Sequence, residues 1–166
     1  MAVSPSLRSA RLHYAPLSEE DFDALHDIMS DWSVVRQLGS WPWPPEPDFT
    51  RLRCRPYRGT GFIYGVRLDG VLIGTNGVTD GEIGYCFGRD WWGQGFATES
   101  SRVVIEQAFN TGLTSIAAKV WDDNASSYRL LTKLGFRETH RFSEMSKARG
   151  IETGSIALVL DRADYA

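Results

Sequence analysis

The stretch WWGQGFATES, from Trp91 to Ser100, places two glycines around a glutamine and then turns at once into helix-forming sequence. The first N–H groups of a helix have no acceptor within the helix, and the helix dipole favours negative charge at that end. Gly93 and Gly95 would let a phosphate approach the amides of Gln94 to Thr98. The pattern indicates an anion site. The alternative is a plain strand-to-helix turn that needs positive backbone torsions.

Two nucleotide-binding loops of similar composition do not fit this stretch. In a dinucleotide-binding fingerprint the third glycine would stand where Thr98 stands, and the segment from Arg89 to Trp92 separates the strand from the glycines. The preceding strand also belongs to a hairpin meander rather than to a parallel sheet. A P-loop is excluded because no Gly-Lys-Ser or Gly-Lys-Thr follows.

Glu82 is the carboxylate best placed for proton transfer. Alternation along a strand puts Glu82, Gly84 and Cys86 on one face, where the two small residues leave room for an amine. A carboxylate in that position can act as a general base, directly or through a water molecule. The alternative is an ordinary charged residue beside the Asp80-Gly81 turn.

Neither thiol nor imidazole chemistry is supported by the pattern of residues. Cys54 and Cys86 are the only cysteines and lack the spacing of a disulfide scaffold or a zinc site. The histidines, His13, His26 and His140, stand in unrelated segments, so none is set to activate Cys86 as a nucleophile or to bind a metal. We therefore expect no metal site.

The elements that must position these residues alternate between strand and helix. In the first half we expect a strand within residues 10–17, a helix that Ser18 followed by Asp21 opens and that runs to about Met29, a short helical piece at 34–38, a rigid proline loop at 41–47, and a solvated turn or two of helix before Pro56. Three antiparallel strands follow over 62–87, with tight turns at Asp69-Gly70 and Asp80-Gly81. In the second half we expect a helix from Gly95 to about Gly112, a strand at 115–121, a helix from Asn124 to Gly135, and closing strands at 136–142 and 155–160. An antiparallel first half thus joins a second half that contains a β-α-β crossover.

The composition describes a single globular domain spanning residues 1–166. The chain has 42% hydrophobic residues and a net charge of −3, with no broad basic patch for nucleic acid. No apolar run approaches the roughly 20 residues of a membrane span, and the N-terminus lacks a signal-peptide core. We expect a cytoplasmic protein that binds neither nucleic acid nor membrane and is a monomer or a homodimer.

Two motifs in order carry a resemblance to a known family. EIGYCFGRDWWGQGFATES followed by VWDDNASSYRLLTKLGF resembles the GNAT superfamily of N-acetyltransferases, in particular the ribosomal-protein alanine N-acetyltransferase (RimJ/RimL-like) branch, and RLHYAPLSEEDFDALHDIMSD is similar to the same branch. The resemblance implies an α+β fold with a central mixed, mostly antiparallel sheet of six to seven strands and about four helices. It also implies acetyl-CoA as the cosubstrate.

The same resemblance assigns roles to the motif residues. The loop would hold the pyrophosphate of CoA, and Trp92 stands where the wider superfamily has a basic residue, which leaves the binding to backbone amides. The backbone of the strand would bind the pantetheine arm and polarise the carbonyl. Asn124 would hold a pantetheine amide, with helix N-capping as a compatible alternative. The implied cofactor-binding residues are Tyr85, Cys86, Phe87, Trp92, Gly93, Gln94, Gly95, Phe96, Ala97, Thr98, Asn124 and Ser127.

The catalytic acid is less defined than the base. Many superfamily members carry a tyrosine seven residues after the asparagine, and Leu131 stands there in this chain. Ser127, one turn after Asn124, can reach a leaving thiolate; the alternative is a surface hydroxyl bonded to its own backbone. Glu82 and Ser127 are therefore the predicted catalytic pair.

The acceptor side is predicted to lie beside the proline loop. Trp41 and Trp43 would form a fixed aromatic wall that binds the acceptor together with Glu82; the alternative is that they cover the core. We expect an N-acetyltransferase that moves acetyl by direct attack to a primary amine, either a protein N-terminus or a small molecule. The acidic net charge favours a cationic acceptor. The alternative function is a non-catalytic acyl-CoA-binding or sensing module of the same fold.

Overall fold

The computed structural model describes residues 7–165 and places their strands in one sheet. In chain order the strands are β1 (Leu7–Arg8), β2 (His13–Ala15), β3 (Gly61–Leu68), β4 (Val71–Thr79), β5 (Glu82–Phe87), β6 (Ser115–Trp121), β7 (Arg137–Met145) and β8 (Glu152–Asp161). The α-helices are α1 (Phe22–Ile28), α2 (Trp32–Val35), α3 (Pro47–Arg53), α4 (Phe96–Asn110) and α5 (Ala125–Lys133). Short 3-10 turns lie at Glu19–Asp21, Arg89–Trp91 and Arg162–Asp164.

The sheet runs in the order β1-β2-β3-β4-β5-β6-β8-β7, and only the β5–β6 pair is parallel. The predicted meander is confirmed as β3, β4 and β5. Its two turns place Asp69 and Asp80 at φ 49°, each followed by a glycine with positive φ. Two successive residues with positive φ are what a tight hairpin turn with the right-handed twist of strands requires.

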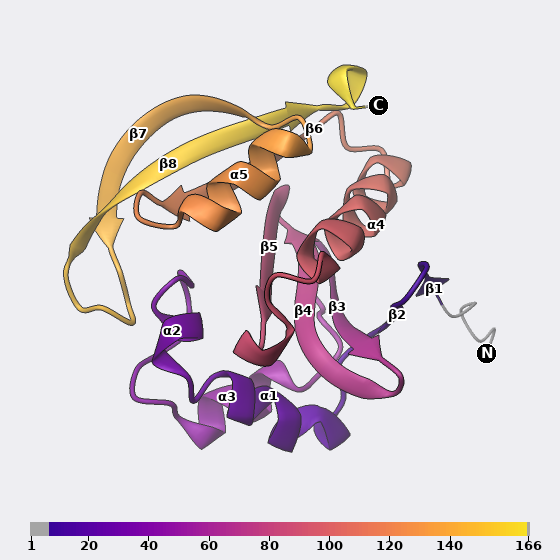
Figure 1. Cartoon of the computed structure of the whole chain (residues 1–166), viewed down its shortest axis with the longest axis vertical. Coiled ribbons are helices and arrows are strands. Elements are labelled where there is room, and N and C mark those ends of the chain that lie inside the picture. The colour runs from indigo at the N-terminus through magenta and orange to yellow at the C-terminus, as the bar shows by residue number, and fades with distance from the viewer. Residues whose placement is uncertain (1–6, 166) are drawn as a thin grey trace.

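The two parallel strands separate almost as soon as they meet. β5 and β6 share one register pair, Glu82 with Ala117, and the Ala117 N–H donates to the Gly81 carbonyl at 2.8 Å. Beyond this point β5 and β6 diverge, and the sheet opens into two halves (Figure 1). The meander and the first helices lie on one side of the opening, and β6, β7, β8 and α5 lie on the other.

Helices cover both faces of the sheet. Val104 and Ile105 of α4 and Leu131 of α5 pack into one buried cluster with Ile116 of β6. On the opposite face Leu25 of α1 packs with other buried side chains of the N-terminal helices against β3, β4 and β5. α4 and the N-terminal helices therefore sandwich the meander, and α5 packs on the half of the sheet formed by β6, β8 and β7.

The predicted fold class, a mixed and mostly antiparallel α+β sheet flanked by helices, is confirmed. Within residues 7–165 the sheet has eight strands, because the two-residue β1 adds an edge next to β2. The proline loop ends at Pro47, which is the first residue of α3, since proline is tolerated in the first turn of a helix. Among the helices of the described residues, none is long and apolar enough to cross a membrane.

Candidate active site

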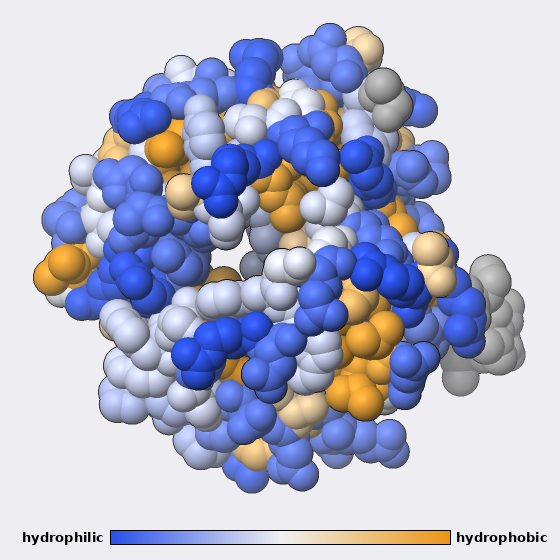
Figure 2. Space-filling model, viewed as in Figure 1, coloured by the Kyte–Doolittle hydropathy of each residue, from blue (hydrophilic) through white to orange (hydrophobic). Residues whose placement is uncertain are grey.

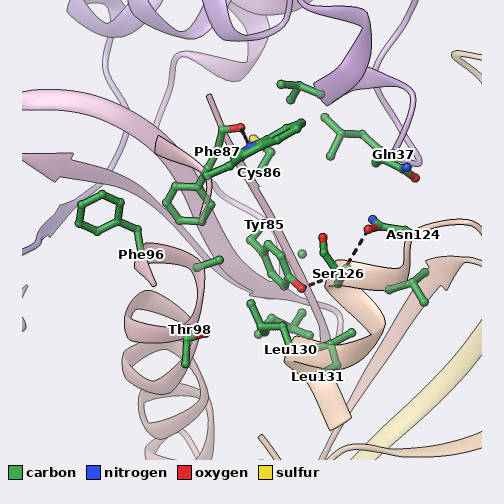
Figure 3. Close-up of a pocket in the computed structure, with 18 of the residues that line it drawn as sticks. Gln37, Tyr85, Cys86, Phe87, Phe96, Thr98, Asn124, Ser126, Leu130 and Leu131 are labelled. Carbon is green, nitrogen blue, oxygen red and sulfur yellow. Dashed lines mark hydrogen bonds between the residues drawn. The ribbon is translucent and has the colours of Figure 1, made fainter. Parts of the chain in front are cut away.

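A cavity of about 800 Å³ lies in the opening between β5 and β6. Figure 2 shows the molecule hollowed near its centre, and Figure 3 shows the residues that point into the cavity. It extends from the glycine loop, along β5, to the first turns of α5. Its lining includes Glu82, Gly84, Tyr85, Cys86, Phe87, Trp92, Gly93, Gly95, Phe96, Ala97, Thr98, Asn124, Ser127 and Leu131.

The glycine loop leads directly into α4, and both of its glycines have left-handed backbone torsions. Gly93 and Gly95 adopt φ 72° and 84°, and Gly95 is the N-cap of the 15-residue helix α4. The Glu99 N–H is bonded to the Gly95 carbonyl, so the preceding amides of Phe96, Ala97 and Thr98 have no acceptor within the helix. These three residues line the cavity. The positive end of α4 therefore faces the space in which an anion would bind.

Arg11 holds this loop from outside the cavity. Its guanidinium donates to the Gln94 carbonyl at 2.9 Å and to Glu99 Oε1 at 2.7 Å, and it lies 4.3 Å from the centre of the Phe96 ring. The Arg11 amide also donates to Glu99 Oε2 at 2.9 Å. Sequence reasoning missed this residue, which fixes the loop without lining the cavity.

Glu99 is ionised at neutral pH in this arrangement. Burial alone would raise its pKa, but hydrogen bonds from the Ser9 hydroxyl and from Arg11 outweigh burial and lower the pKa of Glu99. A carboxylate in the first turn of α4 is also favoured by the helix dipole. The negative charge of Glu99 thus ties the segment before β2 to the start of α4.

The side chains of Trp92 and Gln94 both form hydrogen bonds with backbone carbonyls close to the loop. The Trp92 indole N–H donates to the Phe87 carbonyl at 2.7 Å, so this side chain fixes the end of β5 and also lines the cavity. The Gln94 side chain turns back to the Asp90 carbonyl at 3.1 Å, and Gln94 does not line the cavity. Trp92 stands where the family that the sequence resembles has a basic residue, and its side chain stabilises the end of β5 through the bond to Phe87.

The backbone of β5 presents hydrogen-bonding groups to the opening. The Gly88 N–H donates to β4, whereas the Gly81 carbonyl accepts from β6. Because backbone groups alternate in direction along a strand, Ile83, Tyr85 and Phe87 direct theirs towards β6. β6 has already moved away at this level. The Phe87 carbonyl accepts the Trp92 bond, and the groups of Tyr85 face the cavity.

Tyr85 and Ser127 meet across the cavity. The Tyr85 Oη and Ser127 Oγ atoms lie 2.5 Å apart, and Figure 3 shows the tyrosine extending from β5 to the first turn of α5. Burial raises the pKa of Tyr85 to about 12, and the bond to Ser127 offsets part of that rise. The pair therefore remains fully protonated at neutral pH. Only Ser127 was predicted as an acid, and the Tyr85 hydroxyl was missed.

Asn124 and Leu131 complete the wall formed by α5. The Asn124 Oδ1 atom accepts the Ser127 N–H at 3.2 Å, which makes Asn124 a helix N-cap that also lines the cavity. Its amide NH₂ group remains to donate to a ligand carbonyl. Leu131 is 1% exposed and lines the cavity. In the chain it stands where many members of the family that the sequence resembles carry a tyrosine.

Glu82 and Cys86 lie on the same face of β5, as expected for residues four apart on a strand. Glu82 is half-buried at the point where β5 and β6 separate. Burial raises the pKa of the Cys86 thiol, and hydrogen bonding with Thr75 offsets part of that rise. A neutral, buried thiol is a poor nucleophile.

A second cavity, of about 180 Å³, borders the first. Both cavities are lined by Leu38, Gly84, Tyr85 and Cys86. Trp41, one of the two residues predicted to bind the acceptor, lines the second cavity. Trp43, the other, packs against Trp32 with ring centres 5.2 Å apart and lines neither cavity. Within residues 7–165 no group of three or more histidine, cysteine or acidic side chains is arranged to hold a metal ion.

A model of the acetyltransferase (GNAT) domain matches residues 11–137. The chain therefore belongs to the GNAT family of acetyltransferases.

Similar proteins agree with this assignment. The chain is 43% identical over 148 residues to the uncharacterized N-acetyltransferase YoaA of Bacillus subtilis. This match covers 81% of the chain and 84% of YoaA. It is 29% identical over 162 residues to the uncharacterized N-acetyltransferase p20 of Bacillus licheniformis, over 87% of this chain and 89% of p20. These relatives support N-acetyltransferase activity at the level of the family.

Among solved structures, a ribosomal L7/L12 alpha-N-protein acetyltransferase, RimL, in complex with coenzyme A, superposes with a TM-score of 0.79. The match covers 92% of this chain and 95% of RimL at 17% identity. A crystal structure of a putative acetyltransferase has a TM-score of 0.81 at 17% identity, over 99% of this chain and 93% of the other. At such identities these matches show a shared fold.

Proposed function

We propose that this protein transfers an acetyl group from acetyl-CoA to a primary amine by direct attack, in a single domain spanning residues 1–166. The observation that carries the proposal is the meeting of two cavities at Gly84, Tyr85 and Cys86, one long enough to follow β5 from the glycine loop and one small. A donor and an acceptor can approach the same strand edge from different sides.

The larger cavity fits acetyl-CoA on three counts. The amides of Phe96, Ala97 and Thr98 have no helical acceptor and suit a pyrophosphate. The unpaired backbone of Tyr85 suits a pantetheine amide that adds beside β5. A side-chain carbon built at Gly84 would meet no described atom within 4 Å, so space remains above the strand. The structural neighbour RimL was solved with coenzyme A.

The chemistry that bound acetyl-CoA supplies is an acetyl thioester open to attack by nitrogen. Glu82 is the base that accepts a proton from the amine, directly or through one water. The Tyr85–Ser127 pair lies on the opposite face of β5, because Glu82 and Tyr85 are three residues apart on a strand. This pair donates a hydrogen bond, or a proton, to the sulfur as the C–S bond breaks and the N–C bond forms.

We further propose that Asn124 binds a pantetheine carbonyl through its amide NH₂ group, since its Oδ1 atom is occupied by the N-cap bond. Trp41 is proposed as the acceptor wall, whereas Trp43 packs against Trp32 outside both cavities and is not part of this wall. The RimJ/RimL-like branch stays a prediction, supported by shared fold with the ribosomal-protein enzymes at 16–17% identity.

The proposal is tested by acetyl-CoA titration followed by an amine panel. The panel contains carboxylated amines, neutral amines, polyamines and peptides with a free N-terminus, and products are identified by mass spectrometry. Saturable acetyl-CoA binding with acetylation of at least one amine class supports the proposal. Binding without any acetylation would instead support a binding or sensing module, and no binding would refute both.

A further inference from the structure

The second cavity is lined by one positively charged side chain, that of Arg53, and by no carboxylate. Its polar lining consists of Arg53 from α3, the hydroxyls of Thr75 and Thr79 from β4, and Ser40 from the loop after α2. Tyr85 and Cys86 also line it, and their hydroxyl and thiol are bonded to Ser127 and Thr75; the other lining residues are apolar or glycine. Among the described residues, no acidic side chain lines this space or lies within ion-pair distance of Arg53. The local charge of this cavity is positive.

Aromatic rings hold Arg53 in this position. Its guanidinium carbon lies 4.9 Å from the centre of the Phe49 ring and 5.5 Å from that of Trp41. Lys147 Nζ lies 4.5 Å from the same Phe49 ring and adds a second positive charge nearby. Cation–π contacts of this kind orient a guanidinium without neutralising it. Arg53 thus keeps its hydrogen-bond donors for another partner.

The environment of Arg53 favours binding of an anion. Arg53 is half-buried, and this burial lowers its pKa from the usual value for arginine. A partly buried charge without a counterion is unfavourable, and an oxyanion that enters the cavity would relieve that cost. Guanidinium groups bind carboxylates and phosphonates in a bidentate manner, which gives direction as well as energy.

The position of the cavity relates this anion site to the proposed reaction. The cavity meets the larger one at Gly84, Tyr85 and Cys86, the part of β5 where acetyl transfer is proposed. Arg53 is contributed by α3, so the anion would bind away from the strand edge at which the amine is attacked. The volume of about 180 Å³ is below the usual range for drug-sized ligands, which favours a small molecule.

We propose that the acceptor is a small primary amine that carries its own carboxylate or another oxyanion, bound by Arg53 against the Trp41 wall; this proposal rests on the proposed acetyl transfer. The amine would then point towards Gly84 and Glu82 while the oxyanion points towards α3. The net charge of −3 of the whole chain favours a cationic acceptor, whereas the second cavity, lined by Arg53, is positively charged and favours an acceptor with an oxyanion.

Matched pairs of amines test the proposal in steady-state kinetics. L-Leucine is compared with L-leucinamide, and 2-aminoethylphosphonate with n-propylamine, so that each pair differs in the oxyanion; spermidine represents cationic amines. For the wild type we expect kcat/KM to be about 10- to 100-fold higher for at least one oxyanion member than for its partner, as for a charged hydrogen bond. The pair that shows the preference distinguishes carboxylate from phosphonate.

Variants locate this preference at one residue. Arg53→Gln is expected to raise KM for the oxyanion amine about 10- to 100-fold and to leave kcat/KM for the uncharged partner within about 3-fold. Arg53→Lys keeps the charge and is expected to recover part of the preference. Arg55→Gln removes the same charge from an exposed position that lines neither cavity, and it should behave as the wild type.

Binding measurements separate this proposal from that of acetyl transfer. Isothermal titration calorimetry of each amine into protein saturated with CoA needs no turnover. Tighter binding of an oxyanion amine by the wild type than by Arg53→Gln supports the proposal, even if no product forms. A preference for the uncharged amines or spermidine, equal binding by wild type and Arg53→Gln, or binding of no oxyanion amine would overturn it. Thermal unfolding confirms that each variant is folded.

Discussion

Tyr85 of β5 and Ser127 of α5 are joined by a hydrogen bond of 2.5 Å across the opening of the sheet. The two residues are 42 positions apart in the chain, and the bond links the two halves that separate beyond Glu82. It places two hydroxyl groups in the cavity that Leu131 also lines, and Leu131 stands where many members of the family that the sequence resembles carry a tyrosine. The pair is therefore our candidate for protonating the leaving thiolate.

Removal of either hydroxyl should slow the chemical step. For Tyr85→Phe and Ser127→Ala we expect kcat to fall about 10- to 1000-fold, with little change in the dissociation constant for CoA. The double variant should lose little more than the worse single variant, because both hydroxyls act as one unit. Tyr128→Phe is the control, since its hydroxyl lies on the same helix but bonds to Glu138 at an exposed site. Wild-type turnover in both single variants would exclude this role.

Glu82→Gln should reduce turnover about 10- to 1000-fold at neutral pH, because the amide cannot accept the proton that the acceptor ammonium must lose before its nitrogen attacks. The deficit should shrink as the pH approaches the pKa of the amine, since a deprotonated acceptor needs no base. Asp80→Asn is the matched control, as it removes an exposed carboxylate two residues away at a positive φ that asparagine tolerates. A deficit that is the same at every pH would argue against Glu82 as the base.

Arg11→Ala should weaken acetyl-CoA binding while leaving the chemistry intact. The guanidinium fixes the Gln94 carbonyl and Glu99, and its loss leaves the glycine loop less well ordered for an anion. We expect the dissociation constant for acetyl-CoA to rise about 3- to 30-fold, with kcat at saturation changed by less than about 3-fold. Arg8→Ala, at an exposed position of β1, controls for the lost positive charge. An unchanged dissociation constant in Arg11→Ala would show that Arg11 does not order the glycine loop for acetyl-CoA binding.

Alkaline pH should destabilise the protein through a tyrosine outside the cavities. Burial raises the pKa of Tyr14 from 10.0 to about 12. Because the folded state holds this proton more tightly than the unfolded state, its contribution is fully present below pH 10 and is lost as the pH rises towards 12. Tyr14→Phe should therefore show a shallower loss of unfolding free energy over this range in urea titrations. Parallel curves for the two proteins would contradict the assignment.

The local features of the fold were predictable from the sequence. The Asp69-Gly70 and Asp80-Gly81 turns depend on torsions that few residues adopt, so dipeptides reveal them. The glycine loop is equally local, because Gly93 and Gly95 stand directly before α4. In each case neighbouring residues determine the conformation.

The contacts that define the candidate site depend instead on how distant elements pack. α3 was expected to be solvated because of its arginines, yet Arg53 is half-buried, since Trp41 and Phe49 cover it. Likewise, nothing near Tyr85 in the sequence indicates that its hydroxyl reaches α5. The burial of Arg53 depends on how the proline loop packs on α3, and the Tyr85–Ser127 contact depends on how α5 packs beside β5; no local pattern encodes either arrangement.

The most direct test of the account is a count of products from the wild-type protein. Acetyl-CoA labelled with ¹³C in the acetyl group is incubated with the protein and the amine panel, and free CoA thiol and labelled acetyl-amine are quantified over the same time. Direct attack of the amine on acetyl-CoA predicts equal amounts of free CoA and acetylated amine, with no label left on the protein. CoA released without acetylated amine, label retained on Cys86, or acetyl-CoA bound without any product would contradict it.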